Sequence, residues 1–394
     1  MDDTEKNRIW QKITEYAEAS ASELSELRRD FHRHPEPGWM EFRTSGRIAD
    51  LLHLYGCDEV LTDQQVCKAE ARMGVPEGGG MTGVIGMLHC GMGPTVALRF
   101  DIDALPVREC EELDHFPAQE GFRSEHAGYM HACGHDNHMT GLLGAAMLLC
   151  ERREEIAGTV KLIFQPAEEM SPVGGSRGML HSGYMDDVEA VFGLHVWPDL
   201  PHGKIGVKAG PLMAATDHFT INIHGKTAHG AKPNQGIDAV VLGSQFVMAA
   251  QTIVSRKVDP LDNAVVTFGI FNAGTRYNII AGDCTLDGTV RTLNEDTRAM
   301  IEDSMRKTLD GLCLQSGATA DINYGHGYPA LVNHEEDAEL IRNTAIKLFG
   351  KDDVVDVKLP AMPAEDFSFY LKEKKGAFVW LGTAKQDQDP VWPL

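Results

Sequence analysis

Hydrophobic residues recur with a helical period in the first part of the chain. From Trp10 to about Tyr55, apolar side chains return every three to four residues, which predicts helix. The segment HRHPEPGW interrupts this pattern, because Pro35 and Pro37 cannot continue a helix. We therefore predict two helices joined by a turn.

From Met81 the pattern changes to short apolar runs with helical segments between them. The runs are TGVIGMLHC, PTVALRFDIDALP, TVKLIFQPAEE and EAVFGLHVWP. A further apolar run over residues 139–150 predicts a buried helix, with the segment MHACGHD as a loop leading into it. Alternating strands and helices predict an α/β sheet with helices on its faces.

A second pattern begins after the turn PDLPHG. The predicted order is strand, helix, two strands, helix and strand, over residues 217–225, 236–255, 263–274, 281–292, 295–317 and 318–325. This β-α-β-β-α-β order is typical of a ferredoxin-like unit. A last buried strand, GAFVWLGT (376–383), could rejoin the first sheet. We predict a first domain formed by residues 1–210 and 326–394, with an inserted domain over residues 211–325.

Length and charge narrow the class of protein. A chain of 394 residues is too long for one ordinary core, in agreement with two domains. Its net charge of -22 argues against binding to nucleic acid or to an anionic membrane, because both require basic patches. The start lacks the order of a signal peptide and the longest apolar run is too short to span a bilayer, so we expect a cytoplasmic protein. Eight scattered cysteines show no paired framework and are expected to be free thiols.

Polar residues follow three of the predicted strands. The run VALRF is followed by Asp101 and Asp103, KLIF by the pair Glu168 and Glu169, and AVFGL by His195. Ligands of α/β sheets collect beyond the carboxyl ends of the strands, so these side chains are expected to converge. The segment MHACGHD would be a fourth contributor.

The converging residue types favour a metal site. Cys133 and His135 are spaced like neighbouring ligands, and Glu169 and His195 add a carboxylate and an imidazole. This mixture of nitrogen, oxygen and sulfur suits Zn, Mn, Co or Ni better than Mg or Ca. A lone histidine in a loop is more often a simple hydrogen-bonding residue, so the prediction rests on the combination.

The carboxylates allow more than one interpretation. Glu168 and Glu169 could form a solvated turn, or one could bind metal while the other takes a proton from water and passes it to a leaving amine. Asp101 and Asp103 could cap a turn before Pro106, or one could accept a hydrogen bond from a ligand imidazole and fix its tautomer.

A set of motifs in fixed order carries a resemblance to a known family. They are RRDFHRHPEPGWMEFRT, RFDIDALP, MHACGHDNHMTGLLGAA, IFQPAEE, GLHVWP, GKTAHGAKPNQGIDAV, NAGTRYNII and AEDFSFY. Together they resemble the M20 metallopeptidase superfamily, in the amidohydrolase branch of hippurate, N-acyl-amino-acid and indoleacetyl-amino-acid hydrolases. The variants GWMEFRT and ARMGVPEG look closest to the aminobenzoyl-glutamate hydrolases of this branch.

The resemblance implies a zinc-peptidase-like α/β catalytic domain, with a mixed sheet flanked by helices, and an inserted ferredoxin-like lid that forms a homodimer. It implies two divalent metal ions per subunit, Zn or Mn, with Co or Ni as alternatives. The ligands it implies are Cys133, which bridges the metals, His135, Glu169 and His195, with Glu168 as general base.

In the inserted domain the resemblance assigns one catalytic residue. His229 matches a lid histidine that reaches the active site of the partner and stabilises the tetrahedral oxyanion, although the sequence alone also fits a loop residue without a role. Asn278 and Arg291 lie where such lids can hold a substrate carboxylate, and a strand-pairing or surface role fits equally well.

The implied activity is hydrolysis of the amide bond of N-acyl or N-aroyl amino acids, such as aminobenzoyl-glutamate, hippurate or acetyl-amino acids, or of small dipeptides. The family also supplies a last histidine ligand beyond the final strand, and the sequence ends at DPVWPL without one. We favour a sequence that stops just before this ligand. The alternative is a non-hydrolytic homologue that binds metal and ligand.

Overall fold

The structure is a computed structural model that describes residues 3–66, 75–112 and 114–385. The chain forms two compact units. The first contains Met1–Gly210, Val332–Lys358 and Phe369–Leu394, and the second contains Pro211–Leu331 and Leu359–Ser368. The chain passes between them four times: at β7 (Gly210–Met213), at β14 (Leu331–Asn333), and at each end of the segment Leu359–Ser368.

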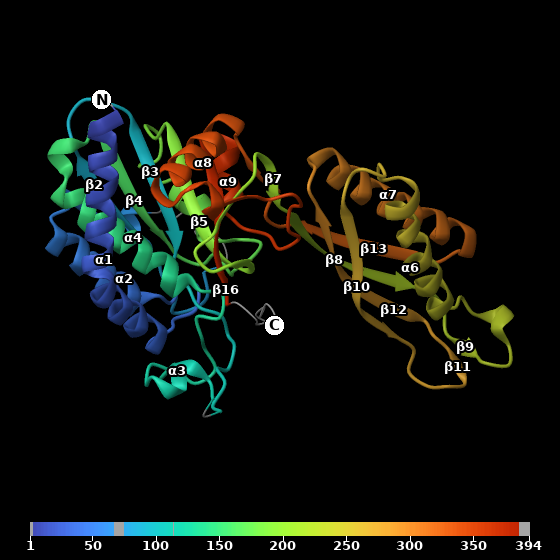
Figure 1. The fold of residues 1–394 in the computed structure, drawn as a ribbon. Helices are drawn as coiled ribbons and strands as arrows, with labels where there is room; N and C mark the ends of the chain where they lie inside the picture. Colours follow the sequence, from blue (N-terminus) through green and yellow to red (C-terminus); the bar gives the residue numbers. More distant parts are fainter. Residues whose placement is uncertain (1–2, 67–74, 113, 386–394) are drawn as a thin grey trace. The chain divides into compact units, whose positions relative to one another are not determined.

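The first unit is built on an eight-stranded sheet with the order β1-β2-β4-β3-β5-β16-β6-β15. Figure 1 labels five of its strands, β2, β3, β4, β5 and β16. Its strands are β1 (Glu59–Thr62), β2 (Val84–His89), β3 (Thr95–Asp101), β4 (Thr159–Gln165), β5 (Ala190–Pro201), β6 (Ile205–Val207), β15 (Val354–Asp356) and β16 (Lys375–Ala384). Strands β4, β3, β5 and β16 run parallel to their neighbours in this series, whereas β2 is antiparallel to β4. The predicted mixed α/β sheet is therefore confirmed.

Three helices share a core with strands β2, β3 and β4; the second and third contact the strands, and the first packs against the third. They are α1 (Asp3–Arg33), α2 (Phe42–Tyr55) and α4 (His135–Glu151). Their apolar faces share one core with the strands, in which Phe31, Leu52 and Leu143 are fully buried. The remaining helices of this unit are α3 (Phe116–Gln119), α5 (Gly175–Leu180), α8 (Glu335–Phe349) and α9 (Ser368–Glu373). The two predicted N-terminal helices are confirmed, and α1 ends two residues before Pro35.

Helix α4 begins earlier than the sequence pattern predicted. The apolar run suggested a start at residue 139, but the helix starts at His135. Gly134 precedes it with φ 92°, a left-handed conformation, and a Cβ atom there would lie 2.6 Å from Cγ2 of Val196. Glycine thus permits a sharp turn into the helix, and His135 lies on its first turn instead of on the predicted loop, with His138 on the same turn.

Strand β5 is longer than predicted, which changes the place of His195. The sequence pattern put His195 after the strand, but β5 continues to Pro201. Its pairing with β3 ends at the Arg99–Gly193 pair, whereas its pairing with β16 continues through His195 and Trp380. His195 therefore lies inside β5, two residues beyond Gly193, the last residue of β5 that pairs with β3.

The second unit has a four-stranded antiparallel sheet with the order β10-β12-β8-β13. The elements are β8 (Ala215–His224), α6 (Ala239–Arg256), β10 (Ala264–Ala273), β12 (Asp283–Thr292), α7 (Glu295–Ser316) and β13 (Thr319–His326), with a small pair β9 (Ala228–His229) and β11 (Ile279–Ile280). Asp238 and Asn294 cap α6 and α7 by accepting hydrogen bonds from backbone amides. This is the predicted ferredoxin-like topology.

Two further sequence expectations can be compared with the described residues. The seven cysteines among them are all free thiols, as predicted. Cys67 and part of the ARMGVPEG segment lie outside the described residues, and so does DPVWPL at the C-terminus. Within the described ranges, no helix is both long and apolar enough to cross a bilayer.

Candidate metal centre

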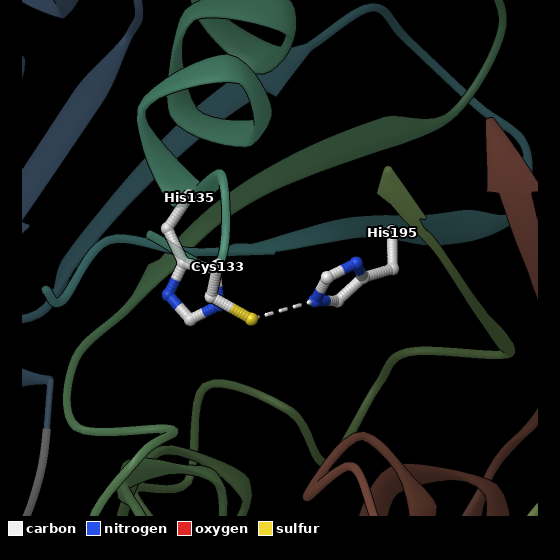
Figure 2. Close-up of side chains that lie close together, drawn as sticks. All are labelled: Cys133, His135 and His195. Carbon is white, nitrogen blue, oxygen red and sulfur yellow. Dashed lines mark hydrogen bonds between the residues drawn. The ribbon is translucent and has the colours of Figure 1, made fainter. Parts of the chain in front are cut away.

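The ends of the central strands and the start of α4 bring several donor atoms together. Ligand atoms of Cys133, His135 and His195 lie within 4.8 Å of one another, and so do those of His135, Glu168 and Glu169. Figure 2 shows the first group, in which Sγ of Cys133 is 3.3 Å from Nε2 of His195. His135 belongs to both groups. The predicted convergence of a thiol, two imidazoles and two carboxylates is therefore present within the first unit.

Hydrogen bonds fix which atoms face the centre. Nδ1 of His135 lies 2.9 Å from the carbonyl oxygen of Asp103 and 3.2 Å from its Oδ1, so this nitrogen is the donor. Nδ1 of His195 likewise donates to the carbonyl oxygen of Val196 at 2.6 Å. In the neutral form of each imidazole, the unprotonated nitrogen is consequently Nε2, the atom that faces the centre.

Two buried atoms at the centre have no hydrogen-bond partner among the described residues. They are Nε2 of His135 and Oε1 of Glu169, which are 3.9 Å apart. The Glu169 backbone amide donates to Oδ2 of Asp103 at 2.9 Å, so Asp103 contacts both residues. Leaving buried polar atoms unpaired costs about 1–3 kcal/mol each, and a cation between these atoms would remove that cost.

The electrostatics of the donor set also fit a cation. Burial raises the pKa of the Cys133 thiol and raises the pKa of Glu169 to about 7. Burial lowers the pKa of His195 to about 3, which keeps its imidazole neutral. Without a metal ion, the protein surroundings thus disfavour the charged forms of Cys133 and Glu169. A divalent cation would stabilise both charged forms and would bind the neutral imidazole of His195. The residues present fit a transition-metal site of the zinc type.

His138 is a buried residue to which sequence reasoning assigned no role. Its Nδ1 is 2.6 Å from Oδ1 of Asp101, and its Nε2 accepts a hydrogen bond from the Val196 amide at 2.9 Å. Although Asp101, His135 and His138 are close enough to hold an ion, both ring nitrogens of His138 already have protein partners. The sequence did offer one indication that His138 lies near the centre: it follows His135 by three residues, and residues with this spacing share a helix face.

Glu41 is a second residue that sequence reasoning missed. It is fully buried, and its Oε1 accepts a hydrogen bond from the Ala167 amide at 2.8 Å while Oε2 accepts one from the Thr82 hydroxyl. Ala167 has φ 57°, an uncommon conformation for a residue with a side chain, and it directly precedes Glu168. Burial, with the nearby charge of Asp103, raises the pKa of Glu41 to about 8. In the sequence, the only indication that Glu41 is buried was its place among the apolar residues Trp39, Met40 and Phe42.

The three predicted residues of the inserted domain lie in the second unit. His229, on β9, is exposed, and its Nδ1 accepts a hydrogen bond from the Ala231 amide at 3.1 Å. Asn278 is nearby, because its carbonyl oxygen accepts from the Gly230 amide at 2.9 Å. Arg291 lies near the opposite end of β12, about 27 Å along the strand from Asp283 at 3.4 Å per residue. The second unit therefore places His229 and Asn278 together and Arg291 apart from them.

A cavity of about 270 Å³ opens beside Cys133 and His195 in the first unit. Trp197 and Thr383 contribute to its wall. Its volume is close to the lower end of the range for small-molecule sites. A small ligand could therefore reach the donor atoms.

Sequence comparison identifies the family. The model of peptidase family M20/M25/M40 matches residues 97–390. The chain belongs to this family. It is accordingly a metal-dependent hydrolase of the peptidase and amidohydrolase type, which confirms the resemblance seen in its motifs.

Individual members of the family are similar over nearly the whole chain. An N-acetyl-L-cysteine deacetylase from Bacillus subtilis is 37% identical over 370 residues, covering 94% of this chain and 82% of the relative. Thermostable carboxypeptidase 1 from Saccharolobus solfataricus is 35% identical over 372 residues, covering 94% and 88%.

Solved structures agree with this assignment. A Bacillus subtilis protein described as a dinuclear metal-binding peptidase of the M20 family superposes with a TM-score of 0.77 at 35% identity, covering 93% of this chain and 89% of that one. An aminobenzoyl-glutamate utilization protein from Klebsiella pneumoniae gives a TM-score of 0.67 at 25% identity, covering 94% and 93%.

Proposed function

We propose that this M20 hydrolase cleaves the amide bond of N-acyl or N-aroyl amino acids, or of small dipeptides, with two zinc or manganese ions. The observation that carries the proposal is the pair of unpartnered buried atoms, Nε2 of His135 and Oε1 of Glu169, beside Cys133 and His195. The names of the deacetylase and carboxypeptidase relatives support a small amino-acid derivative as substrate.

In this proposal Cys133, His135, Glu169 and His195 hold the ions, and Asp101 and Asp103 orient the ligands around them. Divalent cations at this place would polarise the scissile carbonyl and lower the pKa of water toward about 7. The other glutamate of the adjacent pair, Glu168, acts as general base: it is 6% exposed, and its carboxylate lies within the group formed with His135 and Glu169. It takes a proton from the attacking water and delivers that proton to the leaving amine.

His229 is proposed to stabilise the oxyanion. Because its Nδ1 accepts the Ala231 amide hydrogen, the ring proton of the neutral form is on Nε2, which can donate to a developing negative charge. Oδ1 of Asn278 and Nη1 of Arg291 have no hydrogen-bond partner within the described part of the chain, and both are buried atoms. We propose that Asn278 and Arg291 bind the polar groups of the substrate, with Arg291 as the partner of its carboxylate.

The separation of Arg291 from His229 and Asn278 supports a homodimer. One second unit cannot place both ends of β12 at the same small substrate, so we propose that the two copies share each active site, one contributing Arg291 and the other contributing His229 and Asn278. Strand β10 is an edge of its sheet. Ile270 and Phe271 on this edge are exposed, and so is Met248 of α6, which makes this surface suitable for pairing two copies.

The dimer proposal can be tested by complementation. Glu168→Gln and His229→Ala chains are each expected to be inactive, and exchange of subunits places an intact Glu168 opposite an intact His229 in one site of each mixed dimer. Activity should recover to about a quarter of wild type after random exchange. Complete exchange without recovery would contradict action of His229 across the interface.

The activity itself is tested on the wild-type protein with added Mn or Zn. Hippurate, acetyl-amino acids, aminobenzoyl-glutamate and small dipeptides are the substrates, with release of the free amino acid as the measurement. Metal-dependent turnover of at least one amide is expected, and the complete absence of turnover would contradict the proposal. Elemental analysis separates this outcome from the non-hydrolytic alternative, which predicts one tightly bound metal and retained ligand binding.

A further inference from the structure

A buried chain of hydrogen bonds connects the strand ends that carry the candidate ligands. It begins at Gln165, the last residue of β4, whose Oε1 accepts from Nε of Arg99 at 2.8 Å. Arg99, in β3, donates through Nη1 to Oδ2 of Asp101 at 3.0 Å. The other carboxylate oxygen of Asp101 accepts from His138, which contacts Val196 of β5. This series of hydrogen bonds therefore links β4, β3, α4 and β5.

The side chains that form this series of hydrogen bonds are buried. Gln165, Arg99 and Asp101 are 0% exposed and His138 is 1% exposed. Buried charges are retained only where their hydrogen bonds are satisfied, and here each carboxylate oxygen of Asp101 has a donor. Asp101 is therefore held in one orientation by Arg99, and it presents a fixed acceptor to His138.

The partners of His138 determine where its proton lies. A backbone amide can only donate, so Nε2 must be the acceptor of the Val196 hydrogen bond. The proton of the neutral ring is then on Nδ1, where it is donated to Asp101. Both nitrogens are used in this way, which leaves His138 no lone pair for a metal ion.

We propose that His138 is a positioning residue that sets the place of His195 in the metal centre. It does so by holding the amide of Val196, the residue directly after His195, and by packing its ring edge-on against the His195 ring at a centroid distance of 4.5 Å and an angle of 72°. Because His195 lies where β3 no longer pairs with β5, the sheet does not fix this part of the backbone from that side. This inference rests on the proposed role of His195 as a ligand.

Two conservative variants separate the two bonds of His138. In His138→Gln the side-chain amide oxygen reaches toward the position of Nε2 and can accept the Val196 amide hydrogen. In His138→Asn the shorter amide reaches the position of Nδ1 and can donate to Asp101, but it leaves the Val196 amide without an acceptor. Thr140→Val is the matched control, since Thr140 is buried on the same helix and its hydroxyl has no partner among the described residues.

The measurement is metal binding by calorimetric titration of the metal-free full chain with Zn or Mn. Loss of a residue that supports a ligand typically costs 10- to 100-fold in metal affinity. We expect His138→Asn to weaken one metal equivalent by roughly that factor, His138→Gln to restore most of the affinity, and Thr140→Val to match wild type. Equal metal affinity in all four proteins, or equal losses in the Asn and Gln variants, would overturn the proposal.

Nitrogen NMR of the wild-type protein gives a second measurement that does not depend on folding of a variant. We expect the His138 resonances to show a protonated Nδ1 and an unprotonated Nε2 both before and after Zn is added. A shift of the Nε2 resonance to that of a metal-bound nitrogen would make His138 a ligand and overturn the proposal. If the wild-type chain bound no metal at all, the proposed metal function itself would fail, which is a different result from unchanged affinity in the variants.

Discussion

The buried ion pairs of His32 give the most quantitative prediction. His32, near the end of α1, has Nδ1 3.0 Å from Oδ2 of Asp136 and Nε2 3.2 Å from Oε1 of Glu109. Arg28 donates to the same Asp136 oxygen at 2.9 Å. Burial opposes the charged form of His32, but the two carboxylates outweigh it and raise its pKa from 6.5 to about 9. The imidazolium holds α1 to the first turn of α4, next to His135.

The magnitude follows from this pKa. Each tenfold change in proton affinity is worth about 1.4 kcal/mol, so the change from 6.5 to about 9 corresponds to about 3 kcal/mol of stabilisation of the folded first unit. The folded-state pKa is raised, so this contribution is fully present below pH 6.5. It declines above that value and is lost as the pH rises through about 9.

The assay is urea unfolding of the metal-free protein between about pH 6 and pH 10, with wild type compared with His32→Gln. Gln cannot carry the charge, so the variant should be less stable by about 3 kcal/mol at the low end, and the difference should shrink toward the high end. His115→Gln is the control, because His115 also contacts Glu109, at 2.9 Å, but is only half-buried. Parallel stability curves for wild type and His32→Gln would refute the reasoning.

Three further predictions concern the centre itself. Glu168→Gln should lower kcat by about 10²- to 10⁴-fold with metal content unchanged, whereas Glu169→Gln should lose metal by elemental analysis; the reverse pattern would exchange their roles. Glu41→Ala should lower both kcat and Tm because the Ala167 amide loses its buried acceptor, and Glu41→Gln, which keeps an acceptor oxygen, should recover most of each; equal defects in both variants would contradict this role. Removal of metal by a chelator should lower Tm and abolish turnover, with both restored by added Mn or Zn; a Tm that does not respond to the chelator would argue that no structural stabilisation comes from the ions.

Local patterns were sufficient to predict the elements of the fold and the residue types that gather at the candidate site. The breaks at Pro35 and Pro37, the apolar strand runs and the β-α-β-β-α-β order are encoded in neighbouring residues, and all appear in the structure. The convergence of Cys133 and His135 with the glutamate pair could also be anticipated, because parallel strands end at a common edge of the sheet. The period of the apolar residues and the direction of each strand can be read from neighbouring residues. The sequence alone therefore determined the helices, the strands and the edge of the sheet at which the polar residues gather.

Only the tertiary structure decided how those residues are held. Whether His195 lies in or beyond β5 depends on how far β16 pairs with that strand, and the start of α4 depends on the space that Val196 leaves at Gly134. The contacts of Glu41 with Ala167 and of His32 with Asp136 join residues more than a hundred positions apart. No local pattern records such pairs, because a buried polar group is stabilised by whichever distant donor or acceptor the packed fold brings within hydrogen-bond distance.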